Sequence, residues 1–194
     1  MLKHLKTAIL AAVATLLLTG VIYPVAMTGL ASLLFPDQAT GSWIRDEKGR
    51  IVGSELLGQP FSKPGYFQMR PSAAGYGYDA TASGGSNFGP ASQKLRDRVA
   101  AEVRRLRQEN PDAAGEIPAE LVTASASGLD PDLSPASVRW QIPRVAKARG
   151  VAPERIEMLV ASSVEGRTLG FLGEPRVNVL RLNLALDRQF GGLP

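Results

Sequence analysis

Three polar stretches contain the side chains of this chain that could carry chemistry. They are residues 70–73, 83–87 and 123–131. The second reads Ser-Gly-Gly-Ser-Asn, and its glycine-exposed amides could bind an anion, because a helix is expected to begin close behind it. The phosphate-binding loop ends in Gly-Lys-Ser/Thr, and this stretch does not. Turn formation is the alternative, and the local pattern favours it.

The third stretch and Asp132 directly after it combine hydroxyl and carboxylate oxygens, on Thr123, Ser125, Ser127, Asp130 and Asp132. A hard cation needs six or more oxygen ligands, and these residues do not follow a known cation-binding spacing. We therefore predict no metal site and interpret the stretch as the entry to the helix that follows. Gln141, inside that helix, could reach back towards the stretch.

The residue types that are missing exclude several classes of enzyme. The chain has no cysteine and one histidine, His4, which lies near the N-terminus. A Ser-His-Asp arrangement, a thiol nucleophile and the usual zinc sites are therefore excluded from the rest of the chain. We predict no catalytic residues and no tightly bound cofactor. The net charge of +4 includes Lys3 and Lys6, and so small a basic excess does not indicate nucleic-acid binding.

An apolar segment precedes all of these polar stretches. Residues 7–35, 29 positions, contain no Asp, Glu, Lys or Arg. As a helix they would be roughly 43 Å long at 1.5 Å per residue, whereas the hydrocarbon core of a bilayer is about 30 Å thick. We predict a transmembrane helix over residues 7–35. A cleaved export signal is the alternative, but its apolar core is only about 7–15 residues long.

The charges beside this segment predict its orientation. Lys3 and Lys6 precede it, whereas Asp37 and Arg45 are the first charged and the first basic residue after it. Cytoplasmic flanks of membrane helices are enriched in lysine and arginine. We expect residues 1–6 in the cytoplasm and residues 36–194 outside it, in the periplasm.

The apolar segment also has features that favour packing against another membrane helix. Small side chains recur at four-residue spacing, which lets helices approach closely in lipid. Pro24 lacks an amide hydrogen and so frees the Gly20 carbonyl, which needs a partner from a neighbouring helix or a threonine hydroxyl. The predicted packing residues are Ala8, Ala11, Ala12, Thr15, Thr19 and Pro24.

The first elements after the apolar segment are a hairpin and a long irregular stretch. Residues 42–44 and 50–52 flank the polar turn Asp46-Glu47-Lys48-Gly49, which predicts a short β-hairpin. Residues 53–91 are rich in glycine, proline and aromatic side chains, without helical or strand periodicity. So long a loop is usually functional or disordered, and its aromatic content argues against disorder.

Helical periodicity follows at residues 92–110, 134–150 and 153–164. Ser134-Pro135 is a typical helix start and Gly150 a typical helix end. In residues 177–186 leucine alternates with other residues, which predicts a strand, although a helix is the alternative. Because strands and helices mix without βαβ repetition, we predict one α+β domain over residues 36–194.

Blocks of sequence along the whole chain resemble the C subunit of the bacterial high-affinity potassium-pumping ATPase, the Kdp complex. They occur in that family's order, and their number makes the resemblance specific. The blocks are Thr19–Pro24, Phe35–Pro36, Ala39–Ser42, Gly53–Gln59, Tyr66–Phe67, Arg70–Ala73, Ser83–Asn87, Leu121–Pro131, Gln141–Arg149, Phe171–Pro175 and Val177–Asp187.

The resemblance implies a non-catalytic subunit in the cell inner membrane. Its expected partners are a potassium-selective channel-like subunit, a P-type ATPase subunit and a very small subunit. The family is described as an assembly factor and a catalytic chaperone that raises the ATPase subunit's affinity for ATP. The resemblance also implies ATP binding by a serine/glycine motif and a glutamine, which match Ser83, Gly84, Gly85, Ser86, Asn87, Ser125, Ser127, Gly128 and Gln141.

The expected orientation conflicts with direct ATP binding. ATP is cytoplasmic, whereas Lys3 and Lys6 place every one of these residues outside the cytoplasm. Any effect on ATP affinity would then be transmitted through the membrane helices. The alternative is a cap or filter at the potassium entrance, docked through residues 53–91, without nucleotide contact.

Overall fold

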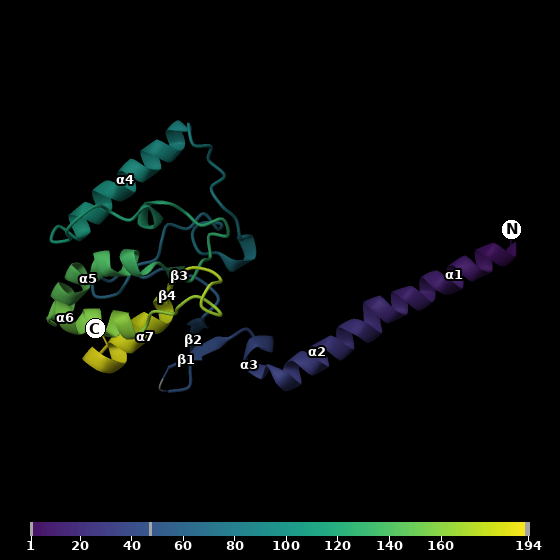
Figure 1. The fold of residues 1–194 in the computed structure, drawn as a ribbon. Coiled ribbons are helices and arrows are strands. Elements are labelled where there is room, and N and C mark those ends of the chain that lie inside the picture. Colours follow the sequence, from purple (N-terminus) through teal and green to yellow (C-terminus); the bar gives the residue numbers. More distant parts are fainter. Residues whose placement is uncertain (1, 47, 193–194) are drawn as a thin grey trace. The chain divides into compact units, whose positions relative to one another are not determined.

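A long apolar helix forms the start of the chain (Figure 1). The computed structural model describes residues 2–46 and 48–192. Helix α1 (Leu2–Leu17) continues through a π-helical turn, η1 (Leu18–Ile22), into α2 (Tyr23–Leu34). Together they form 33 residues that are long and apolar enough, by length and composition, to cross a membrane. The predicted segment 7–35 falls on this helix except for Phe35.

Met1, Glu47, Leu193 and Pro194 lie outside the described residues. Met1 belongs to the expected cytoplasmic segment and Glu47 to the predicted hairpin turn, whereas Leu193 and Pro194 are the last two residues of the predicted domain.

The π-helical turn lies directly before Pro24, which has no amide hydrogen to donate. The Tyr23 amide donates to the Leu18 carbonyl, five residues earlier. Prolines and single π turns are both known sites of local disruption in helices, and here the two are adjacent. The Thr19 hydroxyl donates to the Thr15 carbonyl at 2.8 Å rather than to the carbonyl of Gly20.

Contacts divide the chain into a part up to Ser54 and a part from Glu55 onwards. The first part ends in a short helix, α3 (Pro36–Ala39), and the antiparallel strands β1 (Trp43–Arg45) and β2 (Ile51–Ser54). Trp43 pairs with Ser54 and Arg45 with Ile51, which confirms the predicted hairpin. In its turn the Asp46 carboxylate accepts hydrogen bonds from the Lys48 and Arg50 amides, both at 2.9 Å.

The second part combines helices with one short antiparallel strand pair. Its elements are η2 (Ala80–Ala82), α4 (Gln93–Glu109), η3 (Ala119–Val122), β3 (Asp132–Leu133), α5 (Pro135–Arg149), α6 (Pro153–Ser162), β4 (Val177–Asn178) and α7 (Val179–Phe190). Helix α4 packs on η3, α5 on α6, and α6 on α7. In Figure 1, α4 lies apart from the other three helices, with the segment that follows it in between. The α+β prediction is confirmed.

The ends of α5 follow from local chemistry as predicted. The Ser134 hydroxyl accepts a hydrogen bond from the Ser137 amide at 3.3 Å, and Pro135 occupies the first turn. Gly150 ends the helix at φ +63°, a conformation that glycine adopts without strain. Helices α4 and α6 likewise lie within residues 92–110 and 153–164.

The core of the second part uses residues 55–91 of the irregular segment as well as the helices. Asn183 on α7 holds the Phe67 backbone, accepting its amide at 2.9 Å and donating to its carbonyl at 3.0 Å. The segment therefore obtains from a side chain the hydrogen bonds that a strand would obtain from a neighbour. The fully buried side chains include Phe67, Leu133, Val138, Val145, Ile156, Val160, Val177, Leu182 and Leu186.

The predicted strand over residues 177–186 is wrong. Only Val177 and Asn178 are strand, and they pair with Leu133 and Asp132. The Asn178 side chain then accepts from the Arg181 amide at 3.1 Å and begins α7. Val179, Leu182 and Leu186 are buried together at helical spacing, so the helical period and the cap outweigh the alternation of leucines.

Candidate functional site

The three polar stretches singled out in the sequence meet in space. The Ser72 hydroxyl donates to the Gly128 carbonyl at 2.6 Å. The Ser83 hydroxyl and the Gly84 amide both donate to the Ser127 carbonyl, at 3.0 and 2.9 Å. We call residues 70–73, 83–87 and 123–131 together the polar seam. Contacts between positions about fifty residues apart therefore join the two stretches that contain eight of the nine residues expected to bind nucleotide.

Glycines allow the backbones of the seam to approach closely. Gly128 has φ +68°, and a Cβ atom there would lie 2.6 Å from the Ala74 nitrogen and 2.8 Å from the Gly84 oxygen. A Cβ atom on Gly85 would lie 3.0 Å from the Ala126 oxygen. A larger residue at Gly128 would combine a disfavoured backbone angle with a backbone clash.

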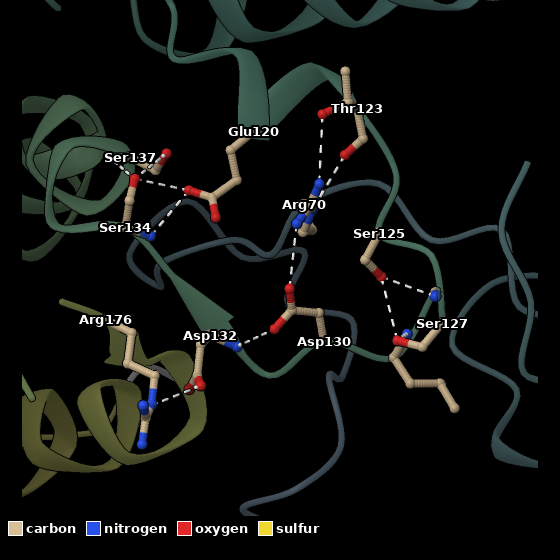
Figure 2. A network of polar contacts seen from close by, with 12 residues as sticks. Arg70, Glu120, Thr123, Ser125, Ser127, Asp130, Asp132, Ser134, Ser137 and Arg176 are labelled. Carbon is tan, nitrogen blue, oxygen red and sulfur yellow. Dashed lines mark hydrogen bonds and ion pairs between the residues drawn. The ribbon is translucent and has the colours of Figure 1, made fainter. Parts of the chain in front are cut away.

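The serine hydroxyls of the seam mainly stabilise its own turns. Ser125 Oγ accepts from the Gly128 amide at 2.8 Å, and Ser127 Oγ accepts from the Leu129 amide at 3.1 Å. The two hydroxyl oxygens lie 3.5 Å apart (Figure 2). Each hydroxyl accepts from the amide two or three residues ahead, which is typical of turns built by serine.

Arg70 ties the first stretch of the seam to the third. Figure 2 shows its guanidinium between Thr123 and Asp130. It donates to the Thr123 carbonyl at 3.2 Å and forms an ion pair with Asp130 at 3.2 Å. Arg70 is half-buried, so solvent screens this pair less than it screens an exposed one.

Two carboxylates at the end of the third stretch face arginines, Asp130 within it and Asp132 directly after it. Asp130 Oδ1 accepts from the Asp132 amide at 3.2 Å, and Asp132 Oδ2 lies 3.2 Å from Arg176 Nε. Burial raises the pKa of Asp132, which Arg176 lowers in part. Among residues 2–46 and 48–192, no three His, Cys, Asp or Glu residues are grouped so that they could hold a metal ion.

Gln141 has a different position from the serines. Its side chain is buried, and its Oε1 accepts from the Gln68 amide and from Arg144 Nη2, both at 2.8 Å. Its Nε2 donates to the Gln68 carbonyl at 3.0 Å and to the Ser137 carbonyl at 3.4 Å. These partners lie outside the seam, so Gln141 holds the Gln68 backbone as Asn183 holds that of Phe67.

Two further residues support the seam and were missed in the sequence. The Glu120 carboxylate accepts from the Ser134 amide at 2.9 Å and from its hydroxyl at 2.8 Å, which links η3 to the start of α5 (Figure 2). Tyr78 donates to the Arg70 carbonyl at 2.8 Å, and burial raises its pKa to about 12. Neither contact has a local sequence signal, because the partners of Glu120 lie 14 residues away and Tyr78 lies in an irregular segment.

Comparison with known proteins agrees with the resemblance. A family model described as "K+-transporting ATPase, c chain" (KdpC) matches residues 5–188. A "Potassium-transporting ATPase KdpC subunit" of Myxococcus xanthus is 64% identical over 194 residues, covering 100% of this chain and 92% of the relative. Subunits of the same name from Caulobacter vibrioides and Methylobacterium nodulans are 53% and 52% identical, covering 98% of this chain and 95% and 100% of the relatives. The resemblance is thereby confirmed, and the chain belongs to the KdpC family, the c chains of K+-transporting ATPases.

Proposed function

We propose that this chain is a non-catalytic accessory subunit of an ATP-driven, high-affinity potassium uptake pump. The match along the full chain carries the proposal, because each relative is named as a subunit of a potassium-transporting ATPase. The side chains of the polar seam bond mainly to the seam's own backbone, which suits a structural role better than a reactive one. The subunit assembles and stabilises the pump and raises the affinity of its P-type ATPase subunit for ATP.

The partners in this proposal are the potassium-selective channel-like subunit, the P-type ATPase subunit and the very small subunit. The apolar helix Leu2–Leu34 anchors the chain in the inner membrane, with its N-terminus in the cytoplasm and the larger part in the periplasm. No described residue of this helix is buried within the chain, so its surface is available to lipid and to partner helices. The chain then acts on ATP affinity through membrane helices, without touching ATP.

Removal of the helix tests this role. When residues 1–35 are deleted from this chain, the pump should purify without the subunit. Exchange of the helix for an unrelated single-pass anchor of the same orientation is the control, because it keeps the chain tethered to the membrane and removes only the specific packing. The pump without the subunit should need more ATP for half-maximal activity, within the roughly 5–150-fold range of coupling between sites. Retention of the truncated chain in the pump would contradict docking through the helix.

One observation favours a second candidate, in which the seam contacts nucleotide. Ser83 and Gly84 lie against Ser127, so the serine/glycine segments expected to bind ATP form one surface. Saturable ATP binding by the full-length subunit, weakened by Ser127→Ala, would support this candidate. Ser127 is exposed, which makes it a better probe than the buried Gln141. Absence of saturable binding would reject direct contact.

A cap at the potassium entrance is a further candidate that a single residue favours. Tyr76 is fully exposed on a turn between Gly75 and Gly77, both at positive φ. The Ser72 hydroxyl accepts the Ala74 and Tyr78 amides, at 3.2 and 2.8 Å, and so fixes this turn. If the turn covers the entrance, Tyr76→Ala should change the potassium concentration for half-maximal transport and leave that for ATP unchanged. An unchanged potassium dependence would argue against the cap.

A further inference from the structure

A second ordered turn, distant in sequence from the polar seam, joins α6 to β4. Glu165 and Arg176 exchange backbone hydrogen bonds at 2.8 and 3.0 Å. Further out, Thr168 and Leu172 exchange two more, both at 2.9 Å. We call residues 168–172 the apolar tip. Two of these four backbone bonds lie within the tip and two lie at its base, so it is a preformed turn rather than a loose loop.

Large apolar side chains project from this tip into solvent. Leu169 is 79% exposed, Phe171 68% and Leu172 50%. The largest exposed apolar patch on a monomeric protein is often functional. These three side chains lie within four residues of one another, and they are not packed against the core.

The backbone of the tip is also strained at one of these exposed residues. Leu169 adopts φ +55°, in the left-handed region, where a residue with a Cβ atom is disfavoured. Gly170 and Gly173 also have positive φ angles, but glycine has no Cβ atom and adopts such angles without strain. A glycine at position 169 would relieve the strain, so the leucine side chain is expected to be stabilised by a contact outside this chain.

The charges around the tip indicate what kind of surface it contacts. Arg167 forms an ion pair with Glu174 at 2.7 Å. Arg176 forms ion pairs with Glu165 at 2.9 Å and with Asp132 at 3.2 Å. The basic side chains beside the tip are therefore neutralised within the chain. A loop that binds anionic lipid by charge would carry an excess of unpaired lysine or arginine instead.

We propose that the apolar tip inserts into an apolar pocket on another subunit of the pump. The proposal rests on the proposed function, in which the chain works only as part of that assembly. A preformed, uncharged turn with projecting Leu169, Phe171 and Leu172 matches the apolar anchors that dominate the centres of protein interfaces. The proposed occupant is a pocket of a partner subunit, and insertion into a bilayer or contact with a second copy of this chain are outcomes that the experiments below separate.

The absence of cysteine allows a direct test with single-cysteine variants of the full-length chain. Labelling of Phe171→Cys by a membrane-impermeant maleimide should be about tenfold slower in the assembled pump than in the subunit alone, because centres of interfaces exclude water. Ala161→Cys, at an exposed position of α6, is the matched control and should be labelled at similar rates in both. Equal labelling of Phe171→Cys in an intact pump would overturn the proposal.

Two further arms distinguish the other occupants. Protection of Phe171→Cys in the isolated subunit reconstituted into zwitterionic vesicles would assign the tip to lipid, and protection that grows with subunit concentration in detergent would assign it to a second copy. Either result overturns the proposal while leaving the proposed function intact. Failure of the unsubstituted chain to co-purify with the pump would remove the proposed function as well.

Leu169→Gly provides a variant that cannot be dismissed as misfolded. It removes an exposed side chain and relieves a disfavoured φ, so the isolated subunit should unfold at the same or a higher temperature. The same variant should be lost from the pump more readily during detergent washes than the unsubstituted chain. Docking through the tip would be contradicted if the pump retained Leu169→Gly as well as the unsubstituted chain and if Phe171→Cys were labelled at the same rate in the assembled pump and in the subunit alone.

Discussion

Among the glycines of the polar seam, Gly128 lies at the closest backbone approach. Its Cβ position lies 2.6 Å from the Ala74 nitrogen, and its φ of +68° disfavours any residue with a Cβ atom. Gly128→Ala should therefore lower the free energy of unfolding by about 3 kcal/mol, from backbone strain and overpacking together. Thermal and denaturant unfolding of the full-length subunit in mild detergent, followed by circular dichroism, measures this.

Gly173→Ala is the matched control, because it separates the backbone angle from the clash. Gly173 has φ +78° but nothing within 4 Å of its Cβ position. Gly173→Ala should lower the free energy of unfolding by only about 1 kcal/mol, the penalty of the left-handed conformation. Equal losses for the two variants would show that the close approach at Gly128 contributes nothing to stability.

Tyr78 predicts a change at alkaline pH. Burial disfavours its phenolate and raises its pKa from 10.0 to about 12. A group whose pKa is higher in the folded state loses its contribution to stability as the pH rises through that pKa. Stability should therefore hold below pH about 10 and fall between about 10 and 12. Ultraviolet titration should find a phenolate transition near pH 12 that Tyr78→Phe removes. An unchanged titration curve in Tyr78→Phe would contradict burial of Tyr78.

The types of the seam residues could be predicted from the sequence, but their partners could not. Serines 125 and 127 form turns with neighbours two or three residues ahead, and such local bonds follow from residue type. Arg70 and Thr123 are 53 residues apart, and Gln68 and Gln141 are 73 apart. No periodicity connects such positions, so the burial of Gln141 away from the seam could not be foreseen.

At the scale of elements, one buried arginine holds α5 to α7 and to the irregular segment. The Arg149 side chain is 2% exposed and pairs with Asp187 at 2.8 Å. Its guanidinium also lies 4.9 Å from the centre of the Tyr66 ring and donates to the Gly65 carbonyl at 2.6 Å. Because removal of one partner leaves a buried charge, Asp187→Ala should lower the free energy of unfolding by about 2–4 kcal/mol.

An exposed ion pair on the same helix provides the comparison. Lys147 pairs with Asp112 at 2.9 Å, but their side chains are 73% and 59% exposed. Asp112→Ala should change the free energy of unfolding by no more than about 0.5 kcal/mol, because water screens this pair. The same unfolding measurement covers both variants. A loss at Asp112 as large as that at Asp187 would mean that burial does not set the strength of these pairs.

Elements with chemical start and end signals were predictable, whereas one with a double periodicity was not. Ser134, Pro135 and Gly150 delimit α5 by their own chemistry. In residues 177–186 the leucines fit a strand face, while Val179, Leu182 and Leu186 fit a helix face equally well. The Asn178 cap and the burial of that second set in the core decide for the helix, and burial is visible only in the structure.

At the scale of the whole molecule, the charges beside the apolar helix should decide which side of the membrane the domain occupies. Lys3→Glu and Lys6→Glu, combined with Asp37→Lys and Gln38→Lys, reverse the bias of basic residues and should invert a large fraction of the chains. In spheroplasts, Ala161→Cys in the unaltered background should react with an impermeant maleimide, and in the reversed background it should be protected. Lys3→Arg with Lys6→Arg keeps the bias and should keep the labelling.

Inverted chains should also fail to support potassium uptake, because the apolar tip would face the cytoplasm. Full uptake by a protected, inverted chain would contradict a periplasmic site of action.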